Sequence, residues 1–234
     1  MKWAPTKKKF QSFRNIATCH PSRDIFDDII SHPKHYSKLQ AQENATSAID
    51  HKKIKYQRVF QYGDTGLSLY VFEKLNWKRG RFSHGMNYGV WYGALEEETS
   101  RLEILYHLRQ QDRELFANPK MTDAYIVHQR AMIRAQCQAS TLVDLRRKKE
   151  NRSELIGNHY AFCHALAQQA VIEGIDAFLT YSARAKGGTC TPIFKPAVII
   201  KDEFIYYFDF IVYRNLTVEY KKSEMTKMQL PEDW

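Results

Sequence analysis

The chain of 234 residues is 44% hydrophobic and 13% aromatic, which supplies enough apolar material for one sizeable core. Its formal net charge of +9, from 35 Lys and Arg against 26 Asp and Glu, favours anionic partners such as phosphates, nucleotides, nucleic acids or acidic proteins. No apolar run approaches the length that spans a bilayer or forms a secretory signal, so we expect a soluble protein without a membrane partner.

Cysteine and histidine usage argues against a metal centre. The four cysteines, Cys19, Cys137, Cys163 and Cys190, lie far apart and form no CxxC pair, so the sequence indicates neither a zinc knuckle nor a disulfide framework. The histidine pairs His32 with His35 and His159 with His164 lack the Cys or carboxylate partners of a zinc site. We therefore expect no metal, and the reduced cytoplasm as the location.

Three segments differ in composition. Residues 1–50 are polar and interrupted by prolines, with one amphipathic stretch at 24–30, and we expect an N-terminal extension packed on the main domain. The main domain is expected over residues 51–220, and its first part, 55–91, combines short apolar runs with glycines in the pattern of short strands and close turns. Residues 221–234 form a polar C-terminal tail.

The rest of the main domain alternates helical and strand patterns. A helix is predicted over 95–108, with early glutamates and an expected buried face of Leu95, Thr99, Leu102, Leu105 and Tyr106. A half-buried strand is predicted over 125–133, with a helix as the alternative, and a second helix over 158–173 closed by Gly174. Strands are predicted over 175–181 and within 192–200 and 204–213. The pattern predicts an α+β fold with many short strands.

Two blocks combine glycine, aromatic and charged residues in a way that a core alone does not require. The first contains Gly80-Arg81-Phe82, then Tyr92, and then Glu103 within the predicted helix. The second runs from Asp176 through Ser182 and Arg184 to Gly187-Gly188. By contrast, the basic runs 7–9 and 146–149 are typical of solvated surface, with nucleic-acid contact as the minor reading.

These blocks resemble the RES family, which is named for the arginine, glutamate and serine that its members share. Gly80-Arg81-Phe82 is similar to the family's Gly-Arg-aromatic stretch, and Tyr92 precedes the helix with Glu103 as the family aromatic does. In the serine block the spacing of Asp176, Ser182 and the glycine pair is kept, but Ala177, Thr180 and Tyr181 replace the family's glycine, tyrosine and proline. Arg58 is the residue most similar to the earlier family arginine.

The resemblance implies an ADP-ribosyltransferase-like fold that binds NAD+ in a cleft and cleaves the bond between nicotinamide and ribose. It implies catalytic roles for Glu103, Arg81, Tyr92 and Ser182, and NAD+ binding by Arg58, Arg81, Tyr92 and Ser182. Many members are toxins that a partner antitoxin blocks, so we expect NAD+ as the substrate, a protein antitoxin, and inorganic phosphate as co-substrate where cleavage is phosphorolytic.

The chemistry of the residues agrees with this assignment. A carboxylate such as Glu103 stabilises the positive charge that develops on the ribose when an N-glycosidic bond breaks. Arg81 and Arg58 offer planar donors to a diphosphate, Tyr92 offers a ring that stacks on nicotinamide, and Ser182 a hydroxyl for a phosphate or ribose oxygen.

Three functions remain open at this point. The first is an NAD+ glycohydrolase or phosphorylase that acts as the toxin of a toxin–antitoxin pair. The second is a transferase that moves ADP-ribose to a protein or nucleotide acceptor, since the same cleft and the same Glu103 would serve it. The third, ranked last, is a non-enzymatic nucleic-acid-binding module, which only the net charge and the run 146–149 favour.

Overall fold

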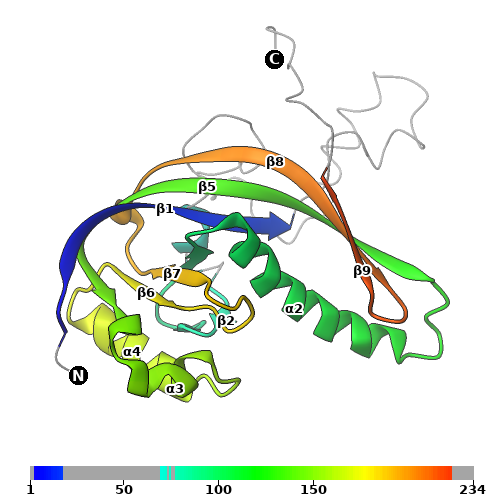
Figure 1. The fold of residues 1–234 in the computed structure, drawn as a ribbon, viewed down its shortest axis with the longest axis horizontal. Coiled ribbons are helices and arrows are strands. Elements are labelled where there is room, and N and C mark those ends of the chain that lie inside the picture. Colours follow the sequence, from blue (N-terminus) through cyan, green and yellow to red (C-terminus); the bar gives the residue numbers. More distant parts are fainter. Residues whose placement is uncertain (1–2, 18–68, 73, 75–76, 223–234) are drawn as a thin grey trace, which may run out of the picture.

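The computed structural model describes residues 3–17, 69–72, 74 and 77–222. Within these ranges the chain forms a seven-stranded sheet, a two-stranded sheet and three α-helices, which confirms the predicted α+β class (Figure 1). Arg58 and the amphipathic stretch 24–30 lie outside the described residues. The division into extension, main domain and tail therefore stays a prediction. No helix of the described part is long and apolar enough to cross a membrane.

The large sheet has the order β1-β4-β7-β6-β5-β8-β9. Its strands are β1 (Thr6–Ala17), β4 (Trp91–Ala94), β5 (Tyr125–Asp144), β6 (Ala177–Tyr181), β7 (Thr189–Ile193), β8 (Ile199–Tyr213) and β9 (Val218–Lys222). Because β1 also pairs with β5, the strands β1, β4, β7, β6 and β5 form a closed ring, and β8 and β9 extend the sheet beyond it. Figure 1 shows β5 and β8 as long curved strands above the shorter β6 and β7.

Helices cover this sheet on two sides. Helix α2 (Glu97–Phe116) lies beneath the long strands, whereas α3 (Arg152–Ile156) and α4 (Ala161–Ile172) lie beside the short ones (Figure 1). The short sheet consists of β2 (Arg79–Gly80) and β3 (Ser83–His84). Four 3-10 turns, η2 (Leu69–Phe72), η4 (Leu145–Arg147), η5 (Lys149–Asn151) and η6 (Pro196–Val198), complete the described elements.

Most predicted elements are confirmed, with shifted ends. The segment 125–133 is a strand and not a helix, and it continues to Asp144. Helix α4 is followed by Gly174 at a φ of 74°, the left-handed backbone expected of a capping glycine. The last described strand, β9, continues to Lys222.

Of the predicted buried face of α2, Thr99 is buried as expected, but the leucines are not. The residues that the helix buries are Thr99, Ser100, Glu103, Leu108, Asp112 and Phe116, while Leu102 and Leu105 are only half-buried. The reason is that this face packs against polar groups of β1 and of the turn after β6: the Asn15 amide donates to the Ser100 carbonyl over 2.8 Å. Polar contacts, which apolar periodicity does not detect, therefore orient the helix that carries Glu103.

The apolar core beside the candidate site lies between the short strands and the helices α3 and α4. Phe82, Leu155, Phe178 and Phe194 are among its buried members, and Tyr92 and Tyr181 pack against it. Through this core the β2–β3 hairpin and β4, which carries Tyr92, pack against β6 and the helices α3 and α4. The block with Arg81 and Tyr92 and the block with Ser182 therefore lie on the same side of the molecule.

Candidate active site

Glu103 and Ser182 meet in a buried pair between α2 and the turn that follows β6. The Ser182 hydroxyl donates to Glu103 Oε1 over 2.5 Å, and the Ala183 amide donates to the same oxygen over 3.0 Å. Both side chains are buried, with 8% exposure each. A helix glutamate is ordinarily solvated, so these contacts set Glu103 apart from its neighbours Glu97 and Glu98.

The turn after β6 is organised around the Ser182 side chain. Its oxygen accepts hydrogen bonds from the amides of Arg184, at 3.1 Å, and Ala185, at 2.8 Å. The turn closes through the Ser182 amide, which donates to the Gly188 carbonyl. A Cβ atom at Gly188 would collide with the Thr99 side chain on α2, which explains why a glycine stands there. This close approach lets the turn reach Glu103.

Arg81 lies in the two-residue turn between β2 and β3 and points into the protein. Its Nη1 donates to the carbonyl oxygens of Leu155, at 3.0 Å, and Gly157, at 2.6 Å, at the end of α3. The guanidinium also lies over the Tyr160 ring, 4.8 Å from its centroid. Burial alone would lower the pKa of Arg81, but Tyr92, Tyr160, Cys163 and Glu103 nearby raise it above its ordinary value.

Tyr92, on β4, completes the group of predicted site residues that the structure describes. Its ring stacks on Phe82 at 6.3 Å between centroids, and its hydroxyl oxygen is fully buried. Burial raises the pKa of Tyr92 well above its ordinary value, and the neighbouring Cys190 and Glu103 raise it further. The phenol is therefore uncharged, and its ring is held by packing.

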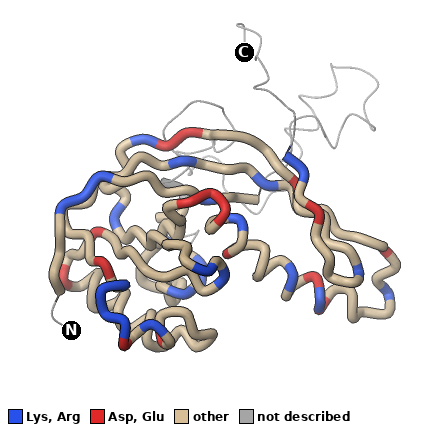
Figure 2. The backbone as a smooth tube through the Cα atoms, in the orientation of Figure 1, with Lys and Arg blue, Asp and Glu red and all other residues tan. Residues whose placement is uncertain are grey.

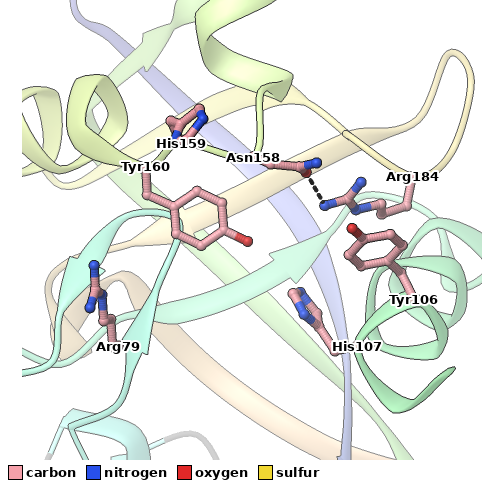
Figure 3. Close-up of a pocket in the computed structure, with 7 residues that line it drawn as sticks. All are labelled: Arg79, Tyr106, His107, Asn158, His159, Tyr160 and Arg184. Carbon is pink, nitrogen blue, oxygen red and sulfur yellow. Dashed lines mark hydrogen bonds between the residues drawn. The ribbon is translucent and has the colours of Figure 1, made fainter. Parts of the chain in front are cut away.

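A pocket of about 440 Å³ opens beside this cluster. It is lined by Arg79 from β2, Tyr106 and His107 from α2, the loop residues Asn158, His159 and Tyr160, and Arg184 from the Ser182 turn (Figure 3). Four of the seven side chains are basic types, two are aromatic and none is acidic. The pocket therefore suits an anionic ligand that carries aromatic rings.

Arg184 joins two walls of the pocket. Its guanidinium carbon lies 3.3 Å from the centroid of the Tyr106 ring, and its Nη2 donates to Asn158 Oδ1 over 2.8 Å (Figure 3). Because its backbone amide also binds Ser182, Arg184 couples the pocket to the buried pair.

Four of the residues predicted from the sequence lie together in the structure: Glu103, Ser182, Tyr92 and Arg81. Glu103 contributes to the pKa shifts of both Tyr92 and Arg81. The residues that line the pocket were not among the predicted site residues. Tyr106 and His107 follow Glu103 by three and four positions on one helix, a spacing that could have indicated them. Asn158 and Tyr160 precede α4 with no motif of their own, so nothing in the sequence indicated them.

The basic run 146–149 is only partly solvated. Arg147 and Lys149 are exposed, but Arg146 binds Asp144 with both Nε and Nη2 and donates from Nη1 to Thr189 Oγ1 over 2.7 Å. Figure 2 shows basic positions on the turns around α3 and near β2, so this side of the molecule attracts anions. Among the described residues, no group of three or more His, Cys, Asp or Glu side chains is placed to hold a metal ion.

Comparisons with known proteins agree with the family resemblance. A family model described as the RES domain matches residues 58–209, which include all five predicted site residues. A search of curated proteins found no match. Among solved structures, the M. tuberculosis MbcT–MbcA toxin–antitoxin complex contains a chain similar to this one at 10% identity and a TM-score of 0.43, over 86% of each chain.

Proposed function

The chain belongs to the RES domain family, and from that premise we propose that it is an enzyme that cleaves the nicotinamide–ribose bond of NAD+. The observation that carries the proposal is the buried Glu103–Ser182 pair beside a basic, aromatic pocket. A pocket of this size falls within the range of about 300–1,000 Å³ typical of small-molecule sites. NAD+ combines the two features that the pocket favours, a diphosphate and two planar rings.

Glu103 is the residue proposed to act on the reacting ribose. As nicotinamide departs, positive charge develops on the ribose, and a fixed carboxylate stabilises that charge more in the transition state than in the bound substrate. The protein holds Oε1 through Ser182 and Ala183, so Oε2 is the oxygen proposed to face the ribose hydroxyls. Ser182 thus contributes by positioning the carboxylate.

Arg184 and Arg79 are proposed to bind the diphosphate, in addition to the arginines expected from the sequence. Both line the pocket, whereas Arg81 uses Nη1 to hold the end of α3. Planar guanidinium groups bind phosphate oxygens in bidentate geometry, which a lysine does not reproduce. The half-buried Tyr106 and Tyr160 rings are proposed to flank a ring of the ligand.

The product identifies the reaction. Purified protein is incubated with NAD+, with and without inorganic phosphate, and the ribose-containing product is identified by mass spectrometry. Nicotinamide release with free ADP-ribose supports hydrolysis, and a phosphorylated ADP-ribose that forms only with phosphate supports phosphorolysis. Release that requires a macromolecular acceptor moves the assignment to the ADP-ribose transferase, and no release in any arm would sink the proposal.

We also propose that the protein is the toxin of a toxin–antitoxin pair, as many RES proteins are. An unregulated enzyme of this kind would deplete its host's NAD+, so the open pocket requires a partner protein that blocks it. Expression of the wild-type chain alone should lower cellular NAD+ and arrest growth, while the Glu103→Ala variant at equal abundance should do neither. Normal growth with folded wild-type protein would contradict the toxin role.

A further inference from the structure

His107 stands in the pocket wall one helical turn after Glu103. Residues four apart on a helix present neighbouring side chains on one face, and Figure 3 shows the His107 ring directed toward the space between Tyr106 and Tyr160. The imidazole is solvent-accessible, whereas Glu103, four positions earlier on the same helix, is buried. His107 is therefore a pocket side chain that solvent reaches and whose pKa Glu103 influences.

We propose that His107 is the general base that deprotonates the water molecule attacking the ribose, which rests on the proposed function. In this step the water oxygen forms a bond to the anomeric carbon as the bond from that carbon to the pyridinium nitrogen breaks. The electron pair of the broken bond leaves with nicotinamide, which becomes neutral. The proton of the attacking water passes to a ring nitrogen of His107 and is later released to solvent.

This assignment divides the work between two residues of α2. Glu103 is held by two hydrogen-bond donors on Oε1 and is placed to stabilise positive charge. His107 is free of that pair and stays in contact with solvent, as a group that must exchange a proton in each turnover requires.

The groups that face His107 keep its imidazole in the form that accepts a proton. Partial burial lowers the pKa of His107 below its ordinary value of 6.5, although solvent still reaches the ring; Glu103 opposes this shift, and Arg184 and Arg81 reinforce it. The Tyr106 ring lies 5.4 Å from the His107 ring on the same helix. Across the pocket stand Arg79, His159 and Tyr160, which add positive or neutral groups and no carboxylate. The neutral imidazole is thus the dominant form near pH 7.

A pH profile of nicotinamide release from NAD+ tests the role. The wild-type kcat/KM, which reports the free enzyme, should fall on the acid side with a midpoint below pH 6.5. His107→Asn should lower kcat at pH 7.5 on the order of 100-fold, change KM little, and remove the acid limb that His107 causes. His159→Asn, a histidine of the same pocket, should keep that limb whatever its rate, and thermal melting checks that each variant is folded.

Rescue by azide distinguishes a general base from a residue with a structural role. Azide attacks carbon without losing a proton, so it needs no general base. Added azide should restore NAD+ breakdown in His107→Ala and should not restore it in Glu103→Ala. An unchanged acid limb and a kcat within threefold of wild type in His107→Asn would overturn the role of His107 alone. Failure of the wild-type chain to release nicotinamide would overturn the proposed function itself, so the two failures are distinguishable.

Discussion

The Ser182 hydroxyl donates a 2.5 Å hydrogen bond to Oε1 of Glu103, although the two residues stand 79 positions apart in the chain. The same oxygen of Ser182 accepts the amides of Arg184 and Ala185. One side chain therefore organises the turn and orients the carboxylate. We therefore propose that Ser182 positions Glu103 and that removal of the glutamate affects the chemistry most.

Glu103→Gln should lower kcat by about 100-fold or more while changing NAD+ affinity less than about threefold. The substitution keeps the size and the hydrogen-bond acceptor for Ser182 but removes the charge that opposes the developing ribosyl cation, an interaction that strengthens in the transition state. Steady-state kinetics and calorimetric NAD+ binding measure the two effects. A folded Glu103→Gln variant with near-normal turnover would exclude Glu103 from the chemical step.

Ser182→Ala should affect both stability and turnover, because it leaves two amides of a tight turn without their acceptor. We expect the free energy of unfolding to fall by about 1–3 kcal/mol. We expect kcat to fall about 10-fold, less than in Glu103→Gln, because the Ala183 amide still binds the carboxylate. Urea denaturation and kinetics on the same preparation measure both. A loss of activity equal to that of Glu103→Gln would give Ser182 a direct part in the reaction.

The sequence predicted which candidate residues lie together better than it predicted the residues around them. Short local motifs identified Gly80-Arg81-Phe82, Tyr92, Glu103 and Ser182. In the structure these residues lie on one side of the fold. The buried face of α2 was missed because Ser100 and Glu103 are buried by polar contacts with Asn15 and Ser182, whose proximity depends on the tertiary fold. The pocket was missed for the same reason: Arg79, Asn158 and Arg184 come from three separate segments.

Arg184→Ala should weaken NAD+ binding alone, whereas Arg81→Ala should also destabilise the fold. Arg184→Ala removes a half-buried pocket cation and should weaken NAD+ binding about 10-fold, with little change in melting temperature. Arg81→Ala removes the donor to two carbonyl oxygens at the end of α3, so it should also lower the free energy of unfolding, by about 2–3 kcal/mol. Binding and melting measured on both variants check this. Equal melting temperatures would show that Arg81 does not stabilise the fold through α3.

His128→Ala should destabilise the fold without a direct effect on the site. Asp112 on α2 is fully buried, and its Oδ2 lies 2.7 Å from His128 Nε2 on β5. Removal of His128 takes away the hydrogen-bond partner of a buried side-chain oxygen, which costs about 1–3 kcal/mol. The double variant Asp112→Asn/His128→Ala should lose less stability in urea denaturation than the sum of the two single variants, because both substitutions remove the same hydrogen bond. If the double variant is as unstable as the sum of the two single variants, the residues do not act as a pair.

Asp176 should make the stability of the fold fall in acid. Its Oδ2 accepts the amides of Ser140 and Thr141, and its Oδ1 accepts Lys195 Nζ, so it ties β5 to the start of β6. Burial alone would raise the pKa of Asp176, but Lys195 and the two amides lower it below its ordinary value of 3.8. A carboxyl group whose pKa is lower in the folded state stabilises the protein at any pH above its pKa in the unfolded chain. This stabilisation is lost as the pH falls through its pKa in the folded protein.

The free energy of unfolding of the wild-type chain should therefore decline as pH drops from about 4 toward 2, and part of this decline should disappear in Asp176→Asn. At pH 7 the variant should be less stable by about 1.5–3 kcal/mol, the usual contribution of hydrogen bonds to a charged group.

Asp144→Asn serves as the matched control, because the pKa of Asp144 is also lowered, mainly by its hydrogen bond with Arg146, at a different point of the sheet. Urea denaturation across this pH range measures the slopes. If the free energy of unfolding of Asp176→Asn changes with pH as steeply as that of the wild type, Asp176 has the same pKa in the folded and unfolded chain. The hydrogen bonds of Asp176 to β5 and Lys195 would then not explain why an aspartate stands in the serine block.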